Sequence, residues 1–214
     1  MTTSDGVRIA GHWYPVTKQK GWALLLHMMP AAKESYGQLA EELERRDIAS
    51  LAIDFRGHGE SQGGQAGYVR FSDAEHQMKI HDVAAAVDWL REQGARDAAT
   101  VLVGASIGAN LALQYLADHG AIPAAVLLSP GLDYRGVKTE PLARRVASSQ
   151  RVLLAAGGED DDYSTETVRA LAMIMGDRAT TRKFANAGHG TTMFQREPTL
   201  LIDVADWIAV QVNR

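Results

Sequence analysis

The sequence predicts an α/β fold in which a mostly parallel sheet carries helices on both faces. From residue 22 onward, short apolar runs of strand length alternate with longer segments of helical periodicity. Alternating strands and helices are typical of parallel sheets, because each crossover helix returns the chain to the same edge of the sheet. No internal repeat, low-complexity segment or linker divides the 214 residues, so we expect one domain over residues 1–214.

The elements follow from composition and spacing. The strands that we expect are 7–16, 22–26, 48–55, 100–104, 126–128, 151–156 and 181–185. The helices that we expect are 35–47, 74–93, 107–119, 165–176 and 197–212. Several of these strands are continuous apolar runs, as in Trp22-Ala23-Leu24-Leu25-Leu26, which is typical of strands buried on both faces.

Composition and charge exclude several classes of protein. The net charge is −4 and no basic run is present, so we expect no nucleic-acid partner. Cysteine is absent, which excludes disulfides, thiolate metal sites and a cysteine nucleophile. No spacing of histidine and glutamate resembles a metal site, and we expect no cofactor. The N-terminus lacks the features of a signal peptide and the apolar runs are too short to span a membrane, so we expect a cytoplasmic protein.

The pattern Gly104-x-Ser106-x-Gly108 lies where the strand at 100–104 meets the next helix. A serine between two such glycines is typical of a sharp strand-to-helix turn that exposes a nucleophilic hydroxyl. Glycine removes side chains that would collide with neighbouring elements. The turn also places the N–H of Ile107 at a helix N-terminus, where it can face a developing negative charge.

An acidic run and a histidine follow two later strands. Glu159, Asp160, Asp161 and Asp162 come after the strand at 151–156, and His189 comes after the strand at 181–185. In a parallel sheet these positions share the carboxyl edge with Ser106. A histidine can take the proton of a serine hydroxyl, and a carboxylate can hold the imidazole in the required tautomer.

At four landmarks the chain resembles the serine-hydrolase branch of the α/β-hydrolase superfamily. They are Leu24-Leu25-Leu26-His27, Asp54-Phe55-Arg56-Gly57-His58-Gly59-Glu60-Ser61, Gly104-Ala105-Ser106-Ile107-Gly108 and Gly188-His189-Gly190. The resemblance implies an α/β-hydrolase fold with Ser106 as nucleophile, His189 as base and an acid near Asp161. It also implies an oxyanion hole formed by the N–H groups of Ile107 and Met29. Met28 stands where this family usually has glycine, and the family's first strand is largely missing, so we expect a shortened sheet.

Several assignments stay open at this stage. Asp160, Asp162 and Asp133 are alternatives to Asp161 as the acid, and the acidic run could instead be a solvated turn or a weak calcium site. Met28 and Met193 either line the acyl pocket or fill the core. His27 and His58 are expected to tie loops together, and Asp54 with Arg56 is expected to form an ion pair that shapes a loop.

The function that we expect is hydrolysis of a small-molecule carboxylic ester through an acyl-enzyme on Ser106. The polar segment 130–150 has few large apolar residues, so no substantial cap is expected and short acyl chains should be preferred. The alternatives are a thioesterase, a small peptide or amide hydrolase, and a non-catalytic binding protein of the same fold. Motifs do not encode the natural substrate or the oligomeric state.

Overall fold

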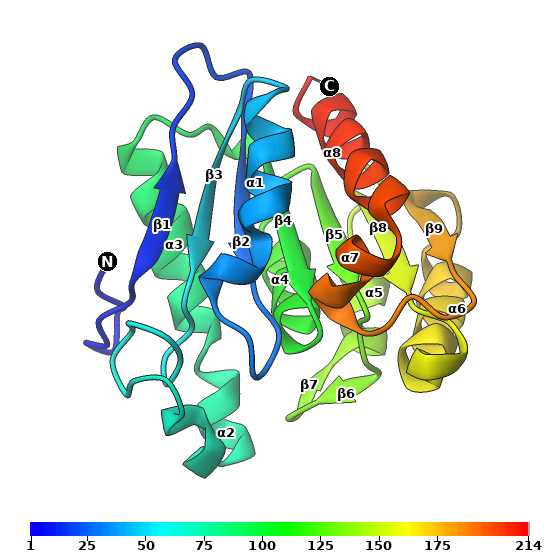
Figure 1. The fold of residues 1–214 in the computed structure, drawn as a ribbon, viewed down its shortest axis with the longest axis horizontal. Coiled ribbons are helices and arrows are strands. Elements are labelled where there is room, and N and C mark those ends of the chain that lie inside the picture. The colour runs from blue at the N-terminus through cyan, green and yellow to red at the C-terminus, as the bar shows by residue number, and fades with distance from the viewer. Residues whose placement is uncertain (214) are drawn as a thin grey trace.

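The structure is a computed structural model that describes residues 1–213, and its centre is a seven-stranded sheet. The strand order is β1-β3-β2-β4-β5-β8-β9, with β1 antiparallel to β3 and every other pair parallel (Figure 1). The strands are Gly11–Tyr14 (β1), Gly21–Leu26 (β2), Ile48–Ile53 (β3), Thr100–Ala105 (β4), Ala124–Leu128 (β5), Arg151–Ala156 (β8) and Ala179–Lys183 (β9). The mostly parallel sheet predicted from the sequence is confirmed.

Helices cover both faces of this sheet (Figure 1). On one face, α1 (Gly37–Glu44) packs against α8 (Pro198–Val212). The helices on the other face are α3 (Ile80–Glu92), α4 (Ile107–Asp118) and α6 (Asp162–Met175). Three shorter helices are α2 (Asp73–Gln77), α5 (Thr139–Arg145) and α7 (Met193–Arg196). Among residues 1–213, no helix combines the length and the apolar character needed to cross a membrane.

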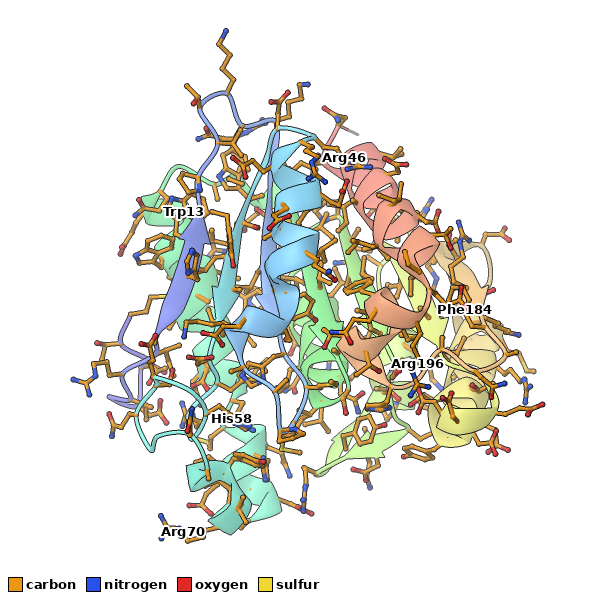
Figure 2. The ribbon with its side chains drawn as sticks, in the orientation of Figure 1. Trp13, Arg46, His58, Arg70, Phe184 and Arg196 are labelled. Atoms are coloured by element: carbon orange, nitrogen blue, oxygen red, sulfur yellow. The ribbon has the colours of Figure 1, made fainter. Side chains whose placement is uncertain are left out.

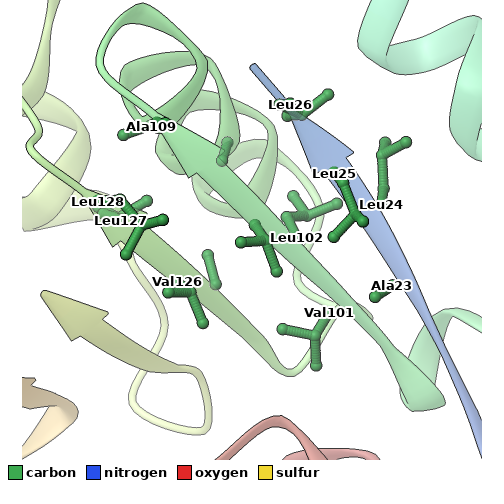
Figure 3. Packing of buried hydrophobic residues seen from close by; sticks show 14 of the residues in the cluster. Ala23, Leu24, Leu25, Leu26, Val101, Leu102, Ala109, Val126, Leu127 and Leu128 are labelled. Atoms are coloured by element: carbon green, nitrogen blue, oxygen red, sulfur yellow. The ribbon is translucent and has the colours of Figure 1, made fainter. Parts of the chain in front are cut away.

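The four central strands, β3, β2, β4 and β5, are buried along their whole length. Figure 3 shows apolar side chains of β2, β4 and β5 packed side by side in this core. Since helices cover both faces, almost every side chain of these strands must be apolar, which is why the sequence shows continuous runs. Truncating one of them, such as Leu102 to alanine, should cost about 2–5 kcal/mol of stability. This core fixes the edge at which the functional loops emerge.

The first and last strands differ from their expected bounds. The strand expected at 7–16 is only β1, and before it Thr2 and Arg8 form an isolated bridge. This agrees with the shortened sheet expected from the sequence. The strand expected at 181–185 begins two residues earlier, as β9. Its side chains are half-buried, because β9 lies at the edge of the sheet, and the apolar signal at its start is correspondingly weak.

The single helix expected at 74–93 is in fact two helices, α2 and α3. A capping box begins α2: the N–H of Glu75 donates to the Ser72 hydroxyl, and the Glu75 carboxylate accepts from the Ser72 N–H. The break between the helices turns Met78 outward to 39% exposure, whereas the sequence led us to expect it on one face of a single helix with Val83 and Val87. Lys79 turns inward and has no exposed surface. Periodicity could not predict this exchange, since lysine is rarely buried.

The polar segment after β5 is also structured. It forms a two-stranded hairpin, β6 (Asp133–Tyr134) and β7 (Val137–Lys138), followed by α5. Helix α5 packs against α4 and α6 rather than over the carboxyl edge of the sheet. The absence of a long helix above this edge, within residues 1–213, agrees with the expectation of no substantial cap.

Lys79 belongs to a buried polar cluster with His58 and His76. Figure 2 shows His58 in the loop beyond β3, next to α2. The Nζ atom of Lys79 lies 5.5 Å from the centre of the Phe55 ring and 6.0 Å from that of Tyr68, and it makes no hydrogen bond with residues 1–213. Burial lowers the pKa of Lys79 to about 7 and lowers the pKa values of both histidines, so that the histidines are neutral at pH 7.

Replacing Lys79 by methionine should therefore change the pH dependence of stability. Between pH 7 and the ordinary lysine pKa of 10.5, the unfolded chain binds a proton that the folded chain does not, so folding becomes more favourable as pH rises. The advantage of Lys79→Met over the wild type should be largest at or below pH 7 and should shrink by about 1.4 kcal/mol per pH unit up to pH 10.

Denaturant unfolding at several pH values measures this difference. Lys18→Met, at an exposed lysine, is the matched control and should show no such slope. A constant difference between Lys79→Met and the wild type over this pH range would contradict the account of a buried, neutral amine.

Candidate active site

Ser106 joins β4 to α4 in a strained conformation, with φ 55° and ψ −122°. A Cβ on Gly104 would lie 2.1 Å from the carbonyl oxygen of Gly108. A Cβ on Gly108 would lie 2.3 Å from the carbonyl oxygen of Leu26 in β2. Both positions therefore require glycine, because the start of α4 presses directly on the backbones of β4 and β2. The turn places Ser106 at the carboxyl edge of the sheet.

Two backbone N–H groups next to this turn have no acceptor among residues 1–213. One belongs to Ile107, the first residue of α4, and the other belongs to Met29 in the loop after β2. The N-terminus of a helix carries partial positive charge, which adds to the field of the first donor. These are the two donors that the resemblance assigns to an oxyanion hole.

His27 fixes the orientation of the second donor. Its Nε2 accepts a hydrogen bond from the N–H of Phe55 at 3.0 Å, so the ring proton is on Nδ1, which donates to the carbonyl oxygen of Met28 at 2.8 Å. Burial lowers the pKa of His27 to about 4, which keeps this neutral tautomer at pH 7. The carbonyl of Met28 and the N–H of Met29 belong to one planar peptide group. By holding the carbonyl, His27 therefore sets the direction of the Met29 N–H.

A buried ion pair holds the other end of the loop after β2. Lys33 donates to the Asp54 carboxylate through both its backbone N–H and its Nζ, each at 2.8 Å. The ion pair expected between Asp54 and Arg56 is not formed, and this prediction was wrong. The chain turns after β3, so the two side chains point to different neighbours, and Arg56 pairs with Asp5 and Asp82.

His189 and Asp161 come together after β9 and β8. The Nδ1 atom of His189 lies 2.9 Å from Oδ1 of Asp161, which is hydrogen-bond distance. Asp160 points elsewhere: its Oδ1 accepts the N–H of Gly188 at 3.0 Å, and its Oδ2 pairs with Arg196 on α7. Figure 2 shows Arg196 at this end of the molecule. Asp160 thus fastens the loop that carries His189, whereas Asp161 contacts its ring.

The other acidic candidates lie apart from the imidazole. Asp162 is exposed at the start of α6. Asp133 is exposed on β6, and its carboxylate accepts the N–H of Gly136. No group of three or more histidine, aspartate and glutamate side chains in residues 1–213 is arranged to hold a metal ion.

Glycines bring the loops that carry Asp161 and His189 into backbone contact. The N–H of Ala187 donates to the carbonyl oxygen of Gly157 at 2.7 Å, and Gly158 forms an isolated bridge with Asn186. A Cβ on Gly157 would lie 1.8 Å from the carbonyl oxygen of Gly188. A side chain at residue 157 would therefore push the two loops apart. The distance between the carboxylate and the imidazole depends on this contact.

Asp161 is ionised in its buried position. Burial acts to raise the pKa of Asp161, but the hydrogen bond to His189 and the nearby hydroxyls of Ser129 and Ser164 outweigh it and hold the pKa below 3.8. Its second oxygen, Oδ2, is buried and has no hydrogen-bond partner within residues 1–213. Ser129 also accepts the N–H of Gly190 at 2.8 Å, which ties the end of β5 to the histidine loop.

Ser106 and His189 belong to the same site, but within residues 1–213 no hydrogen bond joins their side chains. Hydrogen bonds between a nucleophile and its base often shorten only when substrate binds. Ser106 is 8% exposed. Beside it lies Tyr134, whose hydroxyl is 3.3 Å from the Ser164 hydroxyl. Burial raises the pKa of Tyr134, while the nearby hydroxyls of Ser164 and Ser106 oppose that rise. No sequence pattern marks Tyr134, because its position depends on the hairpin.

The two methionines expected near the acyl pocket lie in different surroundings. Met28 is half-buried, and its sulfur would be 2.5 Å from a Cβ on Gly190, so it lies against the loop that follows His189. Met193 has no exposed surface and packs in the core. The structure therefore favours a core position for Met193 over a place in the substrate pocket.

Comparison with known proteins identifies the family. The sequence profile described as serine aminopeptidase, S33, matches residues 17–196. No curated protein matches the chain. Among solved structures, the chain is similar to esterase Pf2001 of Pyrococcus furiosus (TM-score 0.78, 19% identity, covering 98% of this chain and 87% of that one). It is also similar to Est1E of Butyrivibrio proteoclasticus with bound ferulic acid (TM-score 0.78, 16% identity, 98% of both chains). A third is the monoacylglycerol lipase of Paleococcus ferrophilus (TM-score 0.72, 20% identity, 96% of this chain and 99% of that one). The chain belongs to the serine aminopeptidase, S33, family of α/β hydrolases.

Proposed function

We propose that the protein is a serine hydrolase of carboxylic esters with Ser106, His189 and Asp161 as its catalytic triad. The observation that carries the proposal is the hydrogen bond of 2.9 Å between Asp161 and His189 at the same edge as the strained Ser106. A structural role would not require a nucleophile, a base and an ionised carboxylate to meet at one edge of a sheet. The unpaired N–H groups of Met29 and Ile107 support the same function.

The chemistry follows from these positions. His189 removes the proton of the Ser106 hydroxyl through Nε2, and the serine oxygen attacks the ester carbonyl. The carbonyl oxygen becomes negative and is stabilised by the N–H groups of Met29 and Ile107. His189 then gives its proton to the departing alcohol, which leaves an acyl-enzyme. Water gives a proton to the same imidazole and attacks the acyl carbon, and the bond to Ser106 breaks as His189 returns that proton to the serine oxygen. The acid is released, and Asp161 stabilises the imidazolium in each half.

The charges near Ser106 favour an ester over a peptide with a free N-terminus. An aminopeptidase must bind the ammonium group of its substrate, and a carboxylate with free oxygens is the natural partner. Neither carboxylate next to the histidine loop is open to such a group: Asp160 pairs with Arg196 and with the N–H of Gly188, and Asp161 is buried, with its Oδ1 paired to His189. Two similar structures, at 19% and 20% identity, are described as an esterase and a monoacylglycerol lipase, which agrees with this preference. Thioesters and small amides remain the alternative substrates for the same machinery.

The chain should prefer short acyl groups. The residues between β5 and β8 form a short hairpin and α5, which packs on α4 and α6 and offers no long apolar surface above Ser106. Each buried methylene is worth about 0.8 kcal/mol, and a site without such a surface loses that gain beyond the first few carbons. We therefore place the substrates among esters of short acids.

A series of p-nitrophenyl esters from acetate to palmitate tests this function. The value of kcat/KM should be highest between about two and six acyl carbons, and it should not rise when the substrate forms an emulsion.

Ser106→Ala should lower hydrolysis by orders of magnitude, with a residual of about 10³-fold over water from binding and the oxyanion hole. Aminoacyl p-nitroanilides, run in parallel, report the peptidase alternative. Hydrolysis by Ser106→Ala at the wild-type rate would exclude the proposal, and a maximum at decanoate or longer would exclude the short-chain preference.

The acid is tested by a matched pair of neighbouring variants. Asp161→Asn should retain the shape of the site but favour the wrong imidazole tautomer, which lowers kcat by up to about 10⁴. Asp160→Asn should cost much less, because it only weakens the tether between the histidine loop and α7. The measurement is kcat for both variants on p-nitrophenyl acetate, with thermal unfolding as a check on folding. If Asp160→Asn were the crippling change, the assignment of the acid would be wrong.

A further inference from the structure

The β6–β7 hairpin lies at the carboxyl edge of the sheet, between α2 and α6 (Figure 1). At its base, the Asn110 side chain of α4 donates to the carbonyl oxygens of Gly131 and Val137, at 2.9 and 2.8 Å, and accepts the Gly131 N–H at 3.1 Å. At its tip, Gln77 of α2 donates to the carbonyl oxygen of Arg135 at 3.1 Å. These contacts hold the hairpin at both ends, and its base is fixed to the helix that begins after Ser106.

Tyr163 of α6 holds the first strand of the hairpin, β6. The Tyr163 hydroxyl accepts the N–H of Asp133 at 2.9 Å and donates to the carbonyl oxygen of the same residue at 3.3 Å. Its ring also packs edge-on against Tyr134, with centres 5.7 Å apart. The hairpin is therefore a fixed part of the site.

The ring of Tyr134 lies at the centre of this arrangement. It is perpendicular to the imidazole of His189, at 86° and with ring centres 6.4 Å apart. On its other side the ring presses on the backbone, since a Cβ on Gly131 would lie 2.6 Å from it. Its hydroxyl is near Ser164 and Ser106. With backbone on one side and Tyr163 on another, the ring has little freedom to swing away from the nucleophile.

We propose that Tyr134 is the specificity-determining residue of this site, and that its fixed ring is the wall that limits the size of the group bound next to Ser106 and His189. This inference rests on the proposed function, since it concerns the substrate of the same site. A rigid aromatic wall rejects larger groups by overlap, because closely packed protein atoms cannot yield by the volume of a methylene without strain. Removing the ring should admit larger substrates, and enlarging it should exclude some that the wild type accepts.

The test compares four variants on two series of esters. Tyr134→Ala and Tyr134→Trp change the size of the wall in opposite directions, and Tyr134→Phe removes only the hydroxyl. The control, Tyr14→Ala, removes a tyrosine from β1, at the far edge of the sheet. One series extends the acyl group of p-nitrophenyl esters from acetate to palmitate. The other extends the alcohol of acetate esters from ethyl to benzyl. The measured quantity is kcat/KM for each ester relative to the smallest member of its series.

Tyr134→Ala should shift the optimum to larger members of at least one series, with a gain of about fourfold for each methylene that is newly buried. Tyr134→Trp should shift it to smaller members, while Tyr134→Phe and Tyr14→Ala should keep the wild-type profile. If Tyr134→Ala does not fold, the Trp variant and Tyr134→Leu, which also shortens the wall, decide the question. Unchanged profiles in both series for an active Ala or Trp variant would overturn the inference, and so would a change caused by Tyr134→Phe alone. Failure of the proposed function would appear separately, as absence of ester hydrolysis in the wild type.

Discussion

The close packing of α4 on β4 and β2 is the constraint on which the site depends. A Cβ at residue 104 or 108 would overlap backbone atoms at 2.1 or 2.3 Å, so only glycine permits the tight turn between β4 and α4. The same turn holds Ser106 at φ 55° and leaves the Ile107 N–H without an acceptor among residues 1–213. The surrounding buried strands stabilise this strained conformation. Everything else at the carboxyl edge is arranged around that one serine.

Glycine has a second role where two loops meet. Gly157 and Gly188 are in backbone contact, which allows the acid after β8 to reach the histidine after β9. The sequence contains both pairs of glycines, yet only Gly104 and Gly108 form a recognisable pattern. The contact between residues 157 and 188 joins segments that are distant in the chain, and no local spacing can indicate it. The same holds for the Ser129 hydroxyl, which ties β5 to the histidine loop.

The fold could be predicted because its signal is local and repeated. Buried parallel strands such as β2 and β4 appear as apolar runs, and helices such as α8 keep their periodicity. The errors occur where tertiary contacts override local preference. Lys79 is buried among aromatic rings and interrupts the helix expected at 74–93, and Arg56 pairs with Asp5 and Asp82 rather than with its near neighbour Asp54. Tyr134 could not be found from the sequence, since a two-residue strand carries no periodicity and its anchor, Asn110, lies in another element.

The central claim is that Ser106 is a nucleophile activated by its position. The most direct measurement is labelling of the folded wild-type protein with a fluorophosphonate, followed by intact mass and peptide mapping. Such probes bond covalently to a serine hydroxyl only where a neighbouring base activates it. The account predicts one adduct per chain, located on Ser106 and lost when the protein is unfolded before labelling. No adduct on the folded protein, or an adduct on another serine with Ser106 unmodified, would contradict it.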